Sequence, residues 1–104
     1  MNQPPIYLVC YDIADNKIRL KVAQLLIKWG YERFQKSIFT GLQHPADNGR
    51  LWLQLQQLLK KQGNQTDKLV VINISKPNFR NMKILGDADI DIAYILGEKH
   101  TEYL

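Results

Sequence analysis

Asp12 occupies the position in this sequence that most favours metal chemistry. It follows the apolar run Ile6 to Tyr11 and precedes a helix-like segment, and ligands of α/β proteins collect where a strand gives way to a helix. A carboxylate there can hold Mg²⁺, which prefers oxygen ligands and keeps most of its waters. The position equally suits a helix cap or a turn, a role that Asp15 could share. The spacing leaves both roles of Asp12 open.

One carboxylate makes a weak metal site, so the magnesium hypothesis needs a second copy of the chain. If two Asp12 side chains meet on a two-fold axis, they and several waters can share one Mg²⁺ ion. That ion would polarise a phosphodiester and lower the pKa of an attacking water. Without it, two carboxylates so close would repel each other. A chain of 104 residues also exposes much apolar surface, which independently favours a homodimer.

Basic side chains near Asp12 are candidates for holding phosphates. Arg19 and Lys21 lie on the helix-like segment, and Arg33 and Lys36 lie on the strand-like segment that follows it. The guanidinium of Arg33 could clamp a phosphate with two hydrogen bonds. The alternatives are a surface ion pair for Arg33 and a solvated helix face for the lysines. A net charge of +4 is compatible with binding nucleic acid.

The remaining composition excludes several other classes of protein. Cys10 is the only cysteine, so no intramolecular disulfide can form, and inside an apolar strand it should act as a small hydrophobe. With His44 and His100 it makes a poor zinc set, and neither histidine has triad partners at a suggestive spacing. We find no signal peptide and no apolar run of ~18 residues, and therefore expect a cytoplasmic protein without a membrane segment.

Hydrophobic periodicity predicts the elements that must position these residues. Residues 6–13 and 68–75 read as strands, and 31–42 as one bent strand or two short ones. Residues 17–29 follow a helical period after an N-cap at Asp15 or Asn16 and stop at Gly30. A second amphipathic helix begins near Leu51 and ends at Gly63. The segments 81–85 and 89–96 are predicted to be further short strands.

This order of elements predicts an α+β fold in one domain over residues 1–104. Strand, helix, two strands, helix and strand, with right-handed crossovers, give a ferredoxin-like sandwich with additional C-terminal strands. Such a fold does not by itself indicate a function.

Two short motifs resemble the small CRISPR-associated family Cas-two. One is Tyr11-Asp12-Ile13 at the end of an apolar strand, followed by Arg19 on a basic helix that ends at a glycine. The other is an alternating pattern of five residues, Arg33, Gln35, Ser37, Phe39 and Gly41. The resemblance is specific over residues 6–41, and the rest agrees in length and order of elements.

The resemblance implies a homodimer in which the two Asp12 carboxylates face each other and hold Mg²⁺. Members are metal-dependent endonucleases acting on RNA or double-stranded DNA, and they also bridge two dimers of the integrase that inserts new spacers. Positions linked to activity are matched by Tyr11, Asp12, Arg19, Arg33 and Phe39. Lys21 stands where the family often has arginine, and Lys36 where it often has an aromatic residue.

Three functions follow from these observations. The first is an endonuclease, and the second a non-catalytic DNA-bridging scaffold in which Asp12 is dispensable. The third is a ferredoxin-like regulatory or RNA-binding module, which lacks a run of aromatic residues like those of RNA-recognition sheets. The resemblance favours CRISPR adaptation and leaves RNA or DNA open as the substrate. It also implies that the C-terminal strand or tail, near residues 86–104, pairs with the partner subunit.

Overall fold

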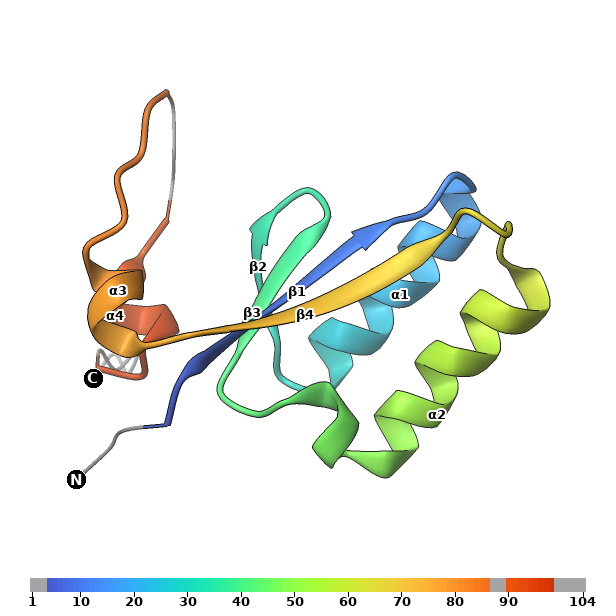
Figure 1. Ribbon diagram of the computed structural model, residues 1–104, viewed down its shortest axis with the longest axis horizontal. Helices are drawn as coiled ribbons and strands as arrows, with labels where there is room; N and C mark the ends of the chain where they lie inside the picture. Colours follow the sequence, from blue (N-terminus) through green and yellow to red (C-terminus); the bar gives the residue numbers. More distant parts are fainter. Residues whose placement is uncertain (1–3, 87–89, 99–104) are drawn as a thin grey trace, which may run out of the picture.

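The computed structural model describes residues 4–86 and 90–98 of the chain (Figure 1). Its strands are β1 (Ile6–Asp12), β2 (Glu32–Gln35), β3 (Ile38–Gly41) and β4 (Lys68–Ile74). Its helices are α1 (Asn16–Lys28), α2 (Gly49–Gln57), α3 (Lys76–Arg80) and α4 (Ile92–Ile95), with a 3-10 turn η1 (Pro45–Asp47) and a π-helical turn η2 (Leu58–Gln62). No helix in these described ranges is long and apolar enough to cross a membrane.

The four strands form one antiparallel sheet in the order β2-β3-β1-β4. The two central strands, β1 and β3, are those with the most buried side chains, which agrees with the apolar character of both faces of β1. In the pairing of β1 with β4, Asp12 lies opposite Lys68 at one end and Ile6 lies opposite Ile74 at the other. Along the chain, β1, α1, β2, β3, α2 and β4 follow one another in the predicted order of strand, helix, two strands, helix and strand.

Helices α1 and α2 lie side by side over one face of the sheet (Figure 1). Val9 and Phe39, both 0% exposed, point toward these helices from the central strands. Each helix contributes apolar side chains at helical spacing to the same core; these are Ile18, Val22 and Leu26 from α1 and Leu51 and Leu55 from α2. The amphipathic pattern of the sequence thus identified the main core.

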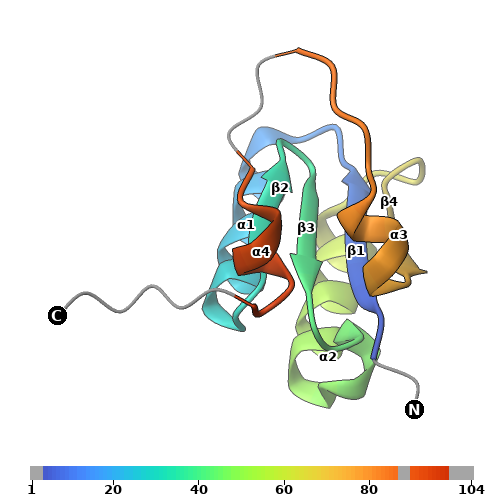
Figure 2. The same cartoon turned by 90° about the vertical axis from the view of Figure 1, so that its left-hand side faces the viewer.

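The short helices α3 and α4 lie against the opposite face of the sheet (Figure 2). Phe79 and Leu96 pack there on Ile6, near the start of β1. They leave uncovered the part of this face near the end of β1, where Val70 and Ile72 are each 46% exposed. We call this part the open face; it comprises Cys10, Asp12, Lys68, Val70 and Ile72.

The start of α1 shows which of the two preceding aspartates caps the helix. The Asp15 carboxylate accepts hydrogen bonds from the backbone N–H of Lys17 at 2.8 Å and of Ile18 at 3.1 Å, so Asp15 is the N-cap. The turn before it is held by Asp67, whose carboxylate accepts from the N–H of Ala14 at 3.0 Å. Asp12 is therefore not needed to begin the helix.

Residues 31–42 form two strands rather than one bent strand. β2 and β3 pair with each other, and their register shifts between Arg33 and Gln35, so the pairing is irregular at that point. At the other end of α1 the chain reverses at Gly30, whose φ of 92° is a conformation that glycine adopts readily. The predicted stop of the helix at Gly30 is confirmed.

The prediction of additional C-terminal strands is wrong for the described residues. Asn81–Leu85 contain no strand, and Ile92–Ile95 form helix α4, capped by the Asp91 carboxylate, which accepts from the N–H of Tyr94. Ile92, Ile95 and Leu96 share one helix face and pack in the Ile6 cluster, so tertiary burial outweighs the alternating pattern of this segment. Residues 87–89 and 99–104 lie outside the described residues, and pairing of the tail with a partner stays a prediction.

Position 41, the last of the sequence motif, requires glycine because its backbone lies against the ring of Tyr31. A Cβ atom at position 41 would fall onto the ring of Tyr31, which is 6% exposed. That ring is fixed, because its hydroxyl donates a 2.6 Å hydrogen bond to the carbonyl of Gln43. Burial, with smaller contributions from Asp47 and Tyr7, raises the pKa of Tyr31 to about 12, so the hydroxyl stays a donor.

We predict that Gly41→Ala lowers the free energy of unfolding by about 1–3 kcal/mol, the usual cost of overpacking a core. Urea unfolding measures this difference. Gly49→Ala is the matched control, because a Cβ at position 49 meets no atom within 4 Å and alanine favours a helix. Equal stabilities of the two variants would mean that Tyr31 moves aside without cost.

Candidate functional site

The Asp12 side chain is exposed at the end of β1 and belongs to the open face. Side chains alternate along a strand, so Tyr11 points toward the helices and Asp12 to the other side. Within the described part of the chain, the Asp12 carboxylate makes no hydrogen bond or ion pair, and no group of three acidic, histidine or cysteine ligands surrounds it. In one copy of the chain, Asp12 is thus an uncommitted oxygen ligand.

Three of the predicted phosphate-binding residues meet on the helix side of the sheet. Arg19 from α1 and Arg33 and Lys36 from the β2–β3 hairpin line one hollow of about 320 Å³. We call it the arginine hollow; its other lining residues are Tyr11, Asn16, Leu20, Ala23 and Ser37. None of the described residues that line it is acidic. Its charge and its hydrogen-bond donors are suited to a phosphate group.

Arg33 is oriented by the hairpin to which it belongs. Its Nη1 donates a 2.7 Å hydrogen bond to the backbone carbonyl of Lys36, and its guanidinium carbon lies 4.9 Å from the centre of the Phe39 ring. The predicted alternative, a surface ion pair, is not present among the described residues, since the only ion pair there joins Arg80 and Glu98. The remaining N–H groups of Arg33 are therefore available to a ligand.

Tyr11 forms the inner wall of the arginine hollow. Its ring is 6% exposed and stacks on Phe39 at 6.2 Å between centroids, and its hydroxyl donates a long, 3.5 Å hydrogen bond to the carbonyl of Lys36. Burial raises the pKa of Tyr11, and the charges of Arg33 and Arg19 offset part of this effect. Tyr11 is therefore a neutral hydrogen-bond donor near pH 7 and a poor general base.

Phe39 is fully buried, so it cannot touch a ligand from the surface. Its ring stacks on the ring of Tyr11 and lies beneath the guanidinium of Arg33, and both of these side chains line the hollow. Its predicted link to activity can therefore operate only through the positions of these two side chains.

Lys21 lies on the opposite flank of α1 from Arg19. Its Nζ donates a 3.2 Å hydrogen bond to Oε1 of Gln62, across the groove between α1 and η2. Asp12 is separated from the hollow as well, because it points to the other face of the sheet. The structure thus brings together Tyr11, Arg19, Arg33 and Lys36, and places Lys21 and Asp12 elsewhere.

Sequence reasoning missed two neighbours of these residues. Lys68 lies directly opposite Asp12 in the sheet and adds a positive charge to the open face. Asn16 lines the arginine hollow beside Arg19. The register of β4 against β1 places Lys68, and no local pattern in the sequence indicates that register.

The fold and the site define a class: a small α+β protein with an antiparallel sheet, a basic hollow on the helix side and an exposed carboxylate on the far face. The chain belongs to the family described as CRISPR associated protein Cas2, whose model matches residues 5–82. This is the Cas-two family that the motifs around Asp12 and Phe39 resemble, so that prediction is confirmed.

Relatives with assigned names support the same family. A protein of Archaeoglobus fulgidus named CRISPR-associated endoribonuclease Cas2 1 is 38% identical over 99 residues, which cover 95% of this chain and 99% of that protein. CRISPR-associated endoribonuclease Cas2 2 of Pyrobaculum aerophilum is 46% identical over 39 residues, which are 38% of this chain and 43% of that protein.

Solved structures share the fold. The crystal structure of Streptococcus pyogenes Cas2 at pH 6.5 has a TM-score of 0.61 at 25% identity, covering 78% of this chain and 99% of that one. A chain of a partial Cas6-RT-Cas1–Cas2 complex has a TM-score of 0.63 at 26% identity, covering 78% of this chain and 90% of that one.

Proposed function

We propose that this chain is a metal-dependent endonuclease of CRISPR adaptation that works as a homodimer in the cytoplasm. The observation that carries the proposal is the Asp12 carboxylate at the end of β1, which is exposed and neither caps a helix nor pairs with a cation among residues 4–86 and 90–98. Two relatives are named endoribonucleases, which favours RNA as the substrate, and double-stranded DNA is the second candidate.

The open face supports dimer formation. Val70 and Ile72 each expose almost half of their surface there, and α3 and α4 shield only the opposite end of this side of the sheet. Packing two ferredoxin-like sheets through the open face would bury these side chains. Asp12 lies on the same face, so a two-fold axis near its position would bring the two carboxylates together.

The donor set is compatible with magnesium in such a dimer. Two Asp12 carboxylates would supply hard oxygen ligands, and water would complete the coordination. A bound ion would supply Lewis acidity and a more acidic water. This chain's own residues would bind the substrate: Lys68, opposite Asp12 in the sheet, would neutralise a phosphate there, and Arg19 and Arg33 would hold phosphates at the arginine hollow.

Removal of the metal tests this proposal. We expect Mg²⁺ to support cleavage of RNA or double-stranded DNA by the purified chain, EDTA to abolish it, and added Mg²⁺ to restore it. Labelled substrates on denaturing gels measure the cleavage. Cleavage that continues in EDTA at the same rate would contradict a metal-dependent mechanism.

A second candidate function is a non-catalytic bridge between integrase dimers. The observation that favours it is the fold similarity to a chain in a solved complex whose name includes Cas1 and Cas2. In this role the basic surfaces would hold duplex DNA, and Asp12 would be dispensable for spacer insertion.

A further inference from the structure

The two helices that cover the sheet carry the whole positive excess of the chain. Residues 16–28 and 49–62, which form α1, α2 and η2, contain seven lysines and arginines and no aspartate or glutamate. The rest of the chain has seven basic and ten acidic residues, so it is net negative. The helical layer is therefore the part of the molecule that attracts polyanions most strongly.

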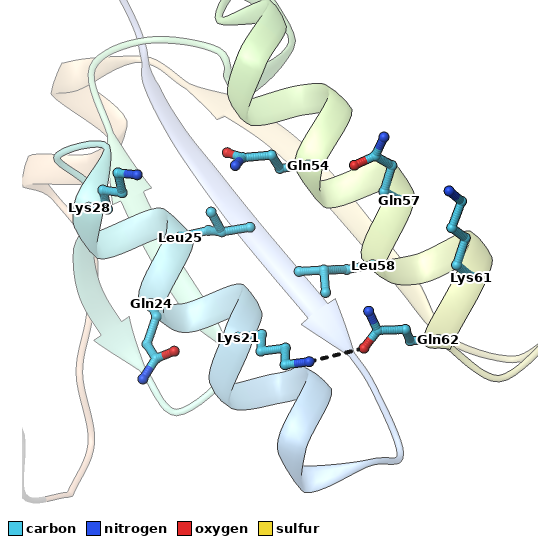
Figure 3. A pocket seen from close by; sticks show the side chains of 9 residues that line it. All are labelled: Lys21, Gln24, Leu25, Lys28, Gln54, Gln57, Leu58, Lys61 and Gln62. Carbon is cyan, nitrogen blue, oxygen red and sulfur yellow. Dashed lines mark hydrogen bonds between the residues drawn. The ribbon is translucent and has the colours of Figure 1, made fainter.

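A groove runs between these helices on the side away from the arginine hollow (Figure 3). Its volume is about 450 Å³, and α1 separates it from the hollow. We call it the interhelical groove. It is lined by four glutamines, three lysines and two leucines, namely Gln24, Gln54, Gln57, Gln62, Lys21, Lys28, Lys61, Leu25 and Leu58.

The walls and floor of the groove differ in chemistry. Leu25 and Leu58 point toward each other from the two helices and form an apolar floor (Figure 3). The hydrogen bond from Lys21 to Gln62 joins the two walls at one end. The Oε1 atom of Gln54, on the α2 wall, is buried and has no hydrogen-bond partner among the described residues, and a buried acceptor left unpaired is costly.

The spacing of the lysines suits a linear array of phosphates. Lys21 and Lys28 are seven residues apart on α1, which is about 10 Å along the helix axis. Phosphates of one strand in a duplex follow each other by about 3.4 Å along its axis, so the backbone positions of the two lysines are about three phosphate steps apart. Lys61 reaches the same groove from η2, a π-helical turn of a kind that often marks a functional site.

We propose that the interhelical groove binds the phosphodiester backbone of one nucleic-acid strand, as a second contact separate from the arginine hollow. This inference rests on the proposed action on nucleic acid. Among the described residues, the groove is lined by no acidic side chain to repel phosphates and no aromatic ring to stack a base, so it would recognise the backbone rather than the sequence. An acidic peptide is the competing occupant.

The test compares two variants of the full-length chain with equal net charge. The groove variant is Lys21→Gln, Lys28→Gln and Lys61→Gln. The control is Arg50→Gln, Lys60→Gln and Lys83→Gln, three exposed residues that do not line the groove. Binding of single-stranded and duplex oligonucleotides is measured by fluorescence anisotropy from 50 to 200 mM salt, after urea unfolding confirms that both variants fold.

We expect the groove variant to lose at least about tenfold in affinity at low salt, and its slope of log K against log salt to fall by about two to three. The control should keep most of the parental slope, and replacing the same three groove lysines with arginine should retain binding. If the groove variant loses affinity for single-stranded oligonucleotides alone, the groove binds unpaired strands. If it loses affinity for single-stranded and duplex oligonucleotides alike, the groove binds the backbone of both.

Three outcomes would overturn the inference. Equal losses in the groove variant and the control would mean that only net charge matters. If the groove variant binds oligonucleotides as the parent does, the groove is not a nucleic-acid site. If Asp12→Ala still removes cleavage in that case, the proposed function stands without the groove. A parent that binds an acidic peptide and no oligonucleotide would refute both the groove's proposed ligand and the proposed function.

Discussion

Asp12→Ala is expected to reduce magnesium-dependent cleavage by at least about a hundredfold, because in the proposed dimer it removes the carboxylate that each subunit would offer to the metal. Even the loss of a partner that merely orients a metal ligand costs about 10–100-fold. The substitution should barely change stability, since Asp12 is exposed and makes no hydrogen bond within the described residues. Cleavage rates, urea unfolding and the mass of the assembly in solution measure these effects.

Asp15→Ala is the matched control for Asp12→Ala, because the two acids are three residues apart and only Asp15 caps α1. Its loss should lower the free energy of unfolding by about 1 kcal/mol and leave cleavage nearly unchanged. If Asp12→Ala cleaves at the parental rate, the metal hypothesis is wrong. If it loses cleavage but still supports spacer insertion with the companion integrase, the bridging function does not depend on hydrolysis.

Phe39→Ala should be the most destabilising of the substitutions discussed here. Phe39 is 0% exposed on a central strand, and truncation of a buried phenylalanine costs about 3–5 kcal/mol. That is a large part of the ~5–15 kcal/mol by which a typical domain is stable. Urea unfolding at 25 °C should show the loss directly. Leu53→Ala, at a side chain that is 54% exposed, is the control and should change stability by less than about 0.5 kcal/mol.

Phe39→Leu separates the packing role of this residue from its effect on the arginine hollow. Leucine keeps an apolar side chain in the core but removes the ring on which the Arg33 guanidinium lies. We expect a fold that remains stable, together with weaker oligonucleotide binding, because Arg33 loses its position. Binding equal to that of the parent, at a temperature where both are folded, would show that Phe39 acts only in packing.

Much of the fold follows from local pattern. The apolar strands, the helix ends at Asp15, Gly30 and Gly63, and the leucines of α2 were all predictable, because strand and helix periods mark the buried faces directly. The C-terminal segment was not predictable in this way. Its alternation of aspartate and isoleucine is compatible with a strand, whereas the helix that is present buries Leu96, with Ile92 and Ile95, in the cluster of Phe79 and Ile6.

The sequence alone determined which residues could do chemistry, and the tertiary structure decided which of them can act together. Tyr11 and Asp12 are adjacent in the chain, yet they face opposite sides of the sheet because strand side chains alternate. Arg19 and Lys21 are two residues apart, about 200° around a helix. Packing of α1 between the β2–β3 hairpin and α2 therefore sends Arg19 to the arginine hollow and Lys21 to the interhelical groove. Partners far apart in the chain, such as Lys68 opposite Asp12, are fixed by strand register, which depends on the packing of the whole sheet.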